Sequence, residues 1–260
     1  LMELVIENIQ NKKKICGNTD VMTDITEWNG VDIDSSANQI RKVTWNYKDL
    51  KGTLNLDWIP ESVWHFEIFC NQLHGTINAA ALPPQLDTLN TGENRLSGEI
   101  DFSSLPNSIT FLSVSKNQFQ GSLDLENLPA KLAKGYFYLN KFSGPISLRK
   151  LPQTLDMLYA NNNELCGSLS FDALPDSLKW LHLSSNGFVG DIDLRNIPSD
   201  IRSLDLQRNR FDGTVQLGVI CNSSWEINLK FNPLKGTILI REAVKHRVLT
   251  TGTKLKKVAQ

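Results

Sequence analysis

The sequence lacks the features that identify membrane proteins and strongly charged proteins. No apolar run approaches the roughly 18 to 20 residues that span a bilayer, and residues 1–10 carry charges where a signal peptide would be apolar. The 27 basic and 28 acidic residues give no field that would steer the chain toward nucleic acid or an anionic membrane. We therefore predict no membrane span. The chain begins with Leu1 rather than methionine, so the compartment stays open, with an intracellular location favoured.

Cysteine is also scarce, and the four cysteines lie far apart in the sequence, at Cys16, Cys70, Cys166 and Cys221. This spacing predicts neither a disulfide framework nor a zinc site. One glycosylation sequon, at Asn222, would matter only in a secreted chain, and a single match of this kind is weak.

What the sequence does contain is a repeat of 23 residues that runs without a slip. An asparagine recurs in eight of nine repeats, and Lys48 occupies its position in the first. The asparagines are Asn71, Asn94, Asn117, Asn140, Asn163, Asn186, Asn209 and Asn232. Four residues later all nine repeats have glycine, from Gly52 to Gly236, and seven have proline eleven residues before the asparagine, from Pro60 to Pro198. Such a period indicates a solenoid whose coils share one core.

Each recurrent position has a structural interpretation. Leucines five and three residues before the asparagine, such as Leu181 and Leu183, alternate as the buried side chains of a strand do. Stacked coils would pair these strands in parallel. The asparagine side chain can bond both donors and acceptors of the turn that follows, and glycine allows a positive φ or a close approach between coils.

A second alternating stretch follows the glycine, as in Ile192-Asp193-Leu194 and Leu123-Asp124-Leu125. We expect it to form a short second strand. The remaining residues of each repeat are too few for a full helix, so turns or single 3₁₀ turns should complete the coil.

The pattern L-P-x-x-L-x-x-L-x-L-x-x-N-x-F/L-x-G-x-I/L resembles leucine-rich repeats of the plant-like class, over about residues 40–240. The resemblance implies a solenoid with a curved parallel β-sheet on its concave face, and short second strands with turns or 3₁₀ turns on its convex side. The 23-residue period and the Ile-Asp-Leu that follows the glycine are similar to arrays in unicellular eukaryotes. The segment Trp28-Asn29-Gly30-Val31 resembles the N-terminal cap of plant-type arrays, but the cysteine pair usual in such caps is absent.

These patterns predict three regions. Residues 1–39 form an N-terminal cap, part helical, with Leu1, Leu4, Val5 and Ile9 on one face. Residues 40–240 form nine leucine-rich repeats of 23 residues. Residues 241–260, with six Lys or Arg against one Glu, form a basic C-terminal cap or a tail that contacts acidic protein or RNA.

Function in such a scaffold is expected on the outward positions of the main strand, which lie six, four and two residues before each asparagine. Aromatic and related side chains gather there in the middle repeats: Phe111, Tyr136, Tyr138, Met157, Tyr159, Trp180 and His182. With strands about 4.8 Å apart, they should form one patch across four coils. Tyr and Trp dominate binding hot spots, although aromatics also favour strands and pack on each other across a ladder.

We therefore predict a non-catalytic scaffold that binds a macromolecular partner, most simply a protein or peptide, through this concave patch. The alternatives are an architectural subunit that uses its back face and basic tail, and a carbohydrate or cell-surface recognition module. We predict no nucleic-acid partner except through the tail. His182 lies near Asp205, but no nucleophile has an oxyanion donor beside it, so we predict no enzyme, no cofactor and no metal.

Overall fold

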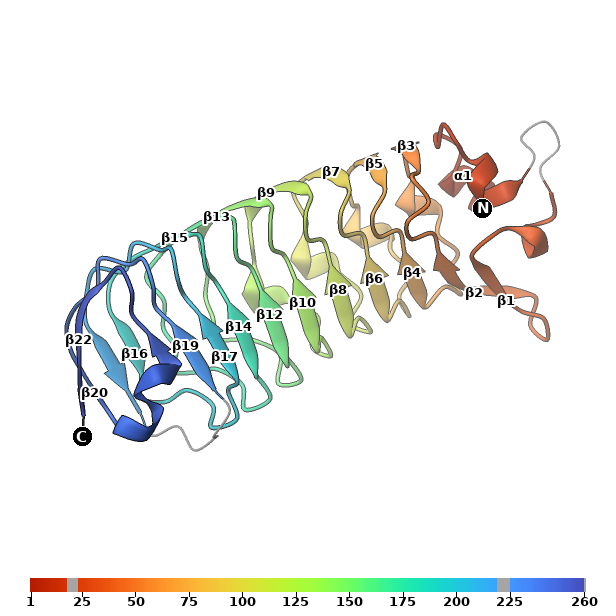
Figure 1. The fold of residues 1–260 in the computed structure, drawn as a ribbon. Coiled ribbons are helices and arrows are strands. Elements are labelled where there is room, and N and C mark those ends of the chain that lie inside the picture. Colours follow the sequence, from red (N-terminus) through yellow and green to blue (C-terminus); the bar gives the residue numbers. More distant parts are fainter. Residues whose placement is uncertain (18–22, 219–224, 260) are drawn as a thin grey trace. The chain divides into compact units, whose positions relative to one another are not determined.

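The computed structural model describes residues 1–17, 23–218 and 225–259, which divide into two compact units. The first comprises Leu1–Gln120 with Pro129–Leu132, and the second comprises Gly121–Leu128 with Ala133–Gln260. Both units are built from the same kind of coil, so within each unit the strands of successive coils lie side by side (Figure 1). Each coil contributes a strand to a main sheet and continues into a second layer of short strands and turns.

The main sheet of the first unit contains β1 (Val31–Asp34), β2 (Gln39–Thr44), β4 (His65–Glu67), β6 (Thr88–Asn90) and β8 (Phe111–Ser113). That of the second contains β10 (Lys134–Tyr136), β12 (Met157–Tyr159), β14 (Trp180–His182), β17 (Ser203–Asp205), β19 (Glu226–Asn228) and β21 (Val248–Leu249). Only the hairpin of β1 and β2 is antiparallel among the described pairs of these two units. Facing residues such as Leu158 and Leu181 are 23 positions apart, which confirms the period and the parallel solenoid.

The core of each coil is the inward side of its main strand. Leu158 and Leu181 are fully buried, and Leu204 is 1% exposed. Burying a leucine stabilises the fold by about 1.5 to 3 kcal/mol, and in a stacked array the atoms that cover it come mostly from the neighbouring coils. No coil could therefore hold this core alone.

The recurrent asparagine joins its own coil to the preceding one. The backbone N–H of Phe188 donates to Asn209 Oδ1 at 3.2 Å, while Asn209 Nδ2 donates to the carbonyl oxygens of Leu183 and Leu206, both at 3.0 Å. Asn209 and Asn232 are 6% and 1% exposed. The predicted structural role of the asparagine is confirmed.

Each unit also has a second layer of short strands. In the first unit these are β3 (Lys51–Thr53), β5 (Gln72–Gly75) and β7 (Arg95–Gly98), and in the second β11 (Lys141–Pro145), β13 (Glu164–Gly167) and β15 (Gly187–Phe188). The strand β9 (Gln118–Ser122) contains the point at which the two units divide. Most of these strands end at or near the recurrent glycine instead of starting after it. The predicted second strand is therefore real, but in most repeats its position is shifted toward the asparagine.

The stretch after the glycine is a 3₁₀ turn in four of the nine repeats: η2 (Leu56–Trp58), η3 (Ala79–Ala81), η4 (Phe102–Ser104) and η5 (Leu125–Asn127). The prediction of a strand at Leu123-Asp124-Leu125 was wrong, because the Asp124 side chain accepts from the Glu126 N–H and caps the turn. At Ile192-Asp193-Leu194 the prediction was right, since β16 (Ile192–Leu194) pairs there with β18 (Val215–Leu217).

Two backbone positions per coil have positive φ. One is the recurrent glycine, at φ +89° in Gly98 and +82° in Gly144. Gly213 has no positive φ. A Cβ there would lie 2.3 Å from Asp191 Oδ1, so glycine is needed at this position because the two coils approach closely. The other position precedes the asparagine and is not glycine; Leu139 and Phe231 have φ of +55° and +56°.

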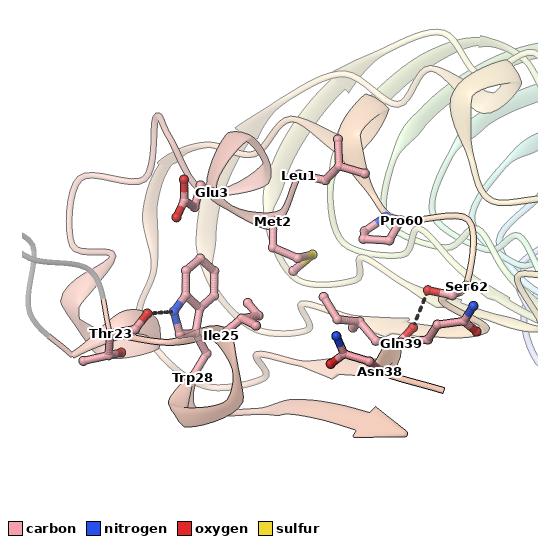
Figure 2. A pocket seen from close by; sticks show the side chains of 11 residues that line it. Leu1, Met2, Glu3, Thr23, Ile25, Trp28, Asn38, Gln39, Pro60 and Ser62 are labelled. Carbon is pink, nitrogen blue, oxygen red and sulfur yellow. Dashed lines mark hydrogen bonds between the residues drawn. The ribbon is translucent and has the colours of Figure 1, made fainter. Parts of the chain in front are cut away.

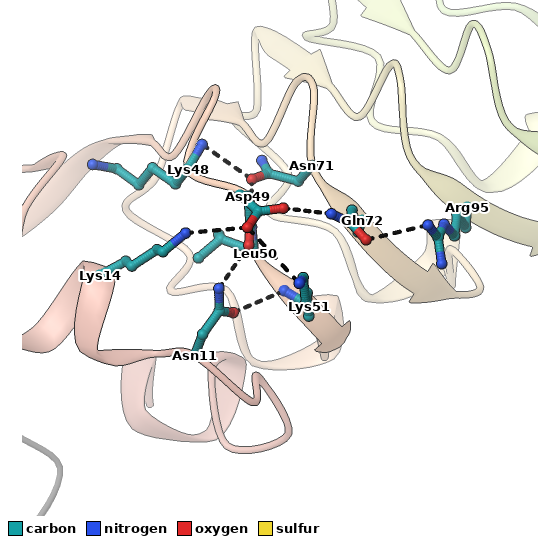
Figure 3. Close-up of polar contacts among 9 residues, drawn as sticks. All are labelled: Asn11, Lys14, Lys48, Asp49, Leu50, Lys51, Asn71, Gln72 and Arg95. Atoms are coloured by element: carbon teal, nitrogen blue, oxygen red, sulfur yellow. Dashed lines mark hydrogen bonds and ion pairs between the residues drawn. The ribbon is translucent and has the colours of Figure 1, made fainter.

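The N-terminal segment covers the outer edge of the second sheet in the first unit. It contains α1 (Met2–Val5), α2 (Lys13–Cys16) and η1 (Ile25–Glu27). Ile9 forms an antiparallel bridge with Gly52, and the Asn11 side chain bonds the N–H of Lys51 and the carbonyl oxygen of Asp49 (Figure 3). Asn11 thus repeats on β3 the bonding that the recurrent asparagines perform between coils.

The predicted apolar face of this segment needs correction. Val5 and Ile9 are buried as expected, but Leu1 and Leu4 are 66% and 37% exposed. The helix α1 has only four residues, so the spacing of a longer helix does not apply. The buried face is made instead by Met2, Val5, Ile6 and Ile9.

The basic C-terminal residues are folded as one more coil. β20 (Lys235–Ile240) pairs in parallel with β22 (Lys254–Ala259), while η6 (Glu242–Arg247) and β21 lie between them in the chain. The Lys257 ammonium donates to the carbonyl oxygens of Lys245 and Val248, each at 3.0 Å, and so ties this coil together. Cys16, Cys70 and Cys166 are present as thiols.

Candidate partner-binding surface

Six of the seven predicted site residues lie in the second unit, on the outward face of its main sheet. The register places Tyr136, Tyr159 and His182 in one row across β10, β12 and β14, and Lys134, Met157 and Trp180 in the next. Except for Lys134, which is exposed, these residues are half-buried. The face therefore presents aromatic surface to the outside instead of burying it in the core.

The rings in the first row contact one another directly. Tyr136 and Tyr159 meet edge to face at 5.3 Å between centroids, and Tyr159 and His182 stack at 4.2 Å with planes 9° apart. The Tyr136 hydroxyl donates to Met157 Sδ at 3.2 Å. These contacts hold the rings in fixed orientations, which lowers the conformational entropy lost when a partner binds them.

Two cations lie near the Trp180 ring. Lys179 Nζ is 5.9 Å and Arg202 Cζ 5.3 Å from the centre of this ring, both within the range of a cation–π contact. Lys179 also pairs with Asp156 at 2.9 Å. The prediction missed these two cations because they stand one position before the outward columns, where the alternation of the strand gives no signal.

Burial shifts the pKa values of the row formed by Tyr136, Tyr159 and His182. It lowers the pKa of His182, and the negative charge of Asp205, directly opposite in the sheet, only partly offsets this effect. The predicted proximity of His182 and Asp205 is confirmed. Burial also raises the pKa of Tyr136 and Tyr159, so both phenols remain hydrogen-bond donors near neutral pH.

Tyr138 and Phe111 have different positions. Tyr138 follows β10, is half-buried, and lies close enough to Tyr136 to contribute to its raised pKa. Phe111 is half-buried in β8 of the first unit. Its membership of the same patch stays a prediction, and Asn222 lies outside the described residues.

A serine and a histidine meet on this face but lack the rest of a catalytic triad. His182 Nε2 and Ser203 Oγ are 2.9 Å apart. The Asp205 carboxylate, however, accepts from the N–H and the side-chain amide of Gln207, so it is committed elsewhere. A triad requires a carboxylate that orients the imidazole and donors for an oxyanion. The His182–Ser203 pair therefore does not form a triad with Asp205.

The three other histidines lie in different elements. His65 lies in β4, His74 in β5 and His246 in η6. In the described part of the chain no group of three or more His, Cys, Asp or Glu side chains could hold a metal ion. No helix among the described residues is long and apolar enough to cross a membrane.

Comparison with known proteins shows the fold. No protein-family model matches the sequence, and no curated protein matches it. Among solved structures, the Arabidopsis receptor kinase HAESA, in complex with the peptide hormone IDA and the co-receptor SERK1, is 23% identical with a TM-score of 0.59. The match covers 75% of this chain and 34% of HAESA. The chain has the plant-like leucine-rich-repeat fold.

Two further comparisons with solved structures differ in extent. The ectodomain of the receptor kinase GASSHO1/SCHENGEN3 from Arabidopsis thaliana, in complex with CASPARIAN STRIP INTEGRITY FACTOR 2, is 16% identical over 98% of this chain and 46% of its own, with a TM-score of 0.51. A plant ice-binding protein is 18% identical over 98% of this chain and 95% of its own, with a TM-score of 0.66. The chain thus spans less than half of either receptor structure.

Proposed function

We propose that this leucine-rich-repeat chain is a non-catalytic interaction scaffold that binds a protein or peptide through the aromatic surface of its second unit. We define that surface as Tyr136, Tyr138, Met157, Tyr159, Trp180 and His182. The observation that carries the proposal is the row of three rings in contact on the outward face of β10, β12 and β14.

Aromatic packing across strands is common and by itself needs no partner. Here the rings stay half-exposed and are flanked by Arg202, an exposed cation that lies over Trp180. Large rigid rings beside an arginine are the composition of interface hot spots. Two of the receptors that share the fold are seen with peptide or protein partners, which supports the same class of ligand here.

The test is affinity capture from an extract of the source cells, using the full chain and the variant Tyr136→Ala, Tyr159→Ala, Trp180→Ala. We expect the variant to lose a protein that the unmodified chain retains. A matched control removes Tyr47, Trp58 and Trp64, which are 72%, 43% and 42% exposed in the first unit, and should retain it. Thermal unfolding of both variants checks that they remain folded. Loss of the partner by the control alone would reject the proposed surface.

A second candidate is an assembly subunit that binds an acidic partner through its last coil. Residues 225–260 carry eight Lys and Arg against two Glu, although the whole chain has a net charge of −1. Lys235 and Lys254 face each other across β20 and β22, where like charges are unfavourable. Binding through this coil would weaken steeply with salt, whereas binding through the aromatic surface would depend on salt only slightly.

A further inference from the structure

A cavity of about 410 Å³ opens in the first unit, where the N-terminal segment meets the first coil (Figure 2). Its walls come from four separate stretches of chain: α1, the segment from Thr23 to Trp28, the residues Asn38–Ile40, and the turn at Pro60 and Ser62. Ligand pockets in proteins commonly measure about 300 to 1,000 Å³. The cavity is therefore large enough for a small organic molecule.

We propose that this cavity binds an amphipathic cation, a molecule with an apolar body and one positively charged group. The apolar part of the proposal rests on the walls, most of which are apolar: Leu1, Met2, Ile25, Trp28, Ile40 and Pro60. Met2 and Trp28 are only 4% and 3% exposed, so the apolar surface open to a ligand comes mainly from Leu1, Ile25, Ile40 and Pro60. An apolar body that filled the cavity would remove this surface from water.

The charge of the ligand follows from Glu3, the one charged side chain that lines the cavity. Figure 2 shows Glu3 at the end of the cavity where Trp28 lies. No hydrogen bond or ion pair engages the Glu3 carboxylate among residues 1–17, 23–218 and 225–259. Glu3 is exposed to solvent, so it would pair with a cation as a surface carboxylate does, weakly and in a salt-dependent way.

Two other polar groups of the wall are already engaged. The Ser62 hydroxyl donates to the carbonyl oxygen of Ile40 at 2.8 Å, and Trp28 Nε1 donates to that of Thr23 at 3.0 Å. The Ser62 bond ties two separate wall segments together, so this part of the cavity is held by the fold and needs little reorganisation on binding.

The test uses dibenzylamine, which is a cation at neutral pH, and dibenzyl ether, its neutral isostere. We expect the amine to bind the full chain with a Kd on the order of 1 mM, given its size. The ether should bind roughly three- to fivefold more weakly at low salt, the range of a partly exposed ion pair. Methyl NMR should show shifts at Met2, Ile25 and Ile40, and none at Ile192 and Ile238 in the second unit.

Substitution of Glu3 separates the charge from the apolar wall. Glu3→Gln should weaken the amine to the affinity of the ether and leave the ether unchanged. Glu7→Gln, an exposed acid of the same segment that does not line the cavity, should change neither. Equal binding of amine and ether by the unmodified chain, an unaffected amine in Glu3→Gln, or the absence of shifts at the three wall residues would each overturn the proposal.

Discussion

Among single residues, the recurrent asparagines carry the connection between coils. Asn209 satisfies one buried donor and two buried acceptors through bonds of 3.0 to 3.2 Å. Leaving a buried polar group without a partner costs about 1 to 3 kcal/mol. We expect Asn209→Ala to lower the free energy of unfolding by about 3 kcal/mol, measured by denaturant titration. The exposed Asn196→Ala should change it by less than about 0.5 kcal/mol. Equal effects of the two variants would contradict the role of the asparagine.

The residue before the asparagine stores backbone strain. Leu139 has φ +55° and is 45% exposed. A bulky side chain therefore occupies a left-handed conformation, and its limited burial offsets little of the strain. Asparagine tolerates this conformation better than leucine. Leu139→Asn should therefore stabilise the chain by about 0.5 to 1 kcal/mol, seen as a higher denaturant midpoint. Leu239→Asn, at an exposed strand position without positive φ, should give no gain.

His182 makes stability depend on pH. Burial lowers its pKa in the folded chain below the ordinary value of 6.5, so the unfolded chain binds a proton more readily. The contribution is complete above pH 6.5 and is lost as the pH falls toward the lowered pKa. The thermal midpoint should decline below pH 6.5 less steeply in His182→Gln than in the unmodified chain. His246→Gln, on the exposed surface of η6, is the control. The same decline in His182→Gln and the unmodified chain would show that another group is responsible, with His65 the next candidate because burial lowers its pKa too.

Among elements, the junction between the N-terminal segment and β3 depends on one glycine. A Cβ on Gly52 would lie 2.3 Å from the carbonyl oxygen of Asn8, and its φ is +106°. Gly144 has φ +82° but no atom within 4 Å of such a Cβ. Its substitution by alanine therefore adds backbone strain without a steric clash, which makes it a control. Gly52→Ala should speed amide exchange at Gln10 and Thr53, which bond across the junction, by tenfold or more if about 1.4 kcal/mol is lost. Gly144→Ala should leave those amides unchanged. Slow exchange at both amides in Gly52→Ala would show that the junction tolerates the extra atom.

Much of the element order could be predicted because the repeat fixes it. A period without slips determines the register, and alternation determines which residues of each main strand face outward. The second strands were misplaced because Asp124 reads equally well as an outward strand residue and as the cap of a 3₁₀ turn. The bridge between Ile9 and Gly52 could not be predicted, since the N-terminal segment has no counterpart within the repeat.

The candidate surfaces show the same limit. The columns of outward residues placed Tyr136, Tyr159 and His182 in one row, because neighbours in a parallel ladder are set by the period alone. The contact of Arg202 with Trp180 depends on a side chain that lies just before a strand. The cavity beside Glu3 is lined by segments that are far apart in the sequence. Neither leaves a periodic signal.

For the whole molecule, function depends on which surface a partner covers. The central claim is that a partner binds at the aromatic surface of the second unit. Hydroxyl radicals readily oxidise the residues of this surface, so footprinting of the full chain, alone and with the captured partner, tests the claim most directly. We predict that the partner protects Met157, Tyr159 and Trp180 from oxidation and leaves Trp58 and Trp64 as reactive as before. If oxidation of the aromatic surface is unchanged and the partner instead protects the first unit's tryptophans or the last coil, the aromatic surface is not the binding site.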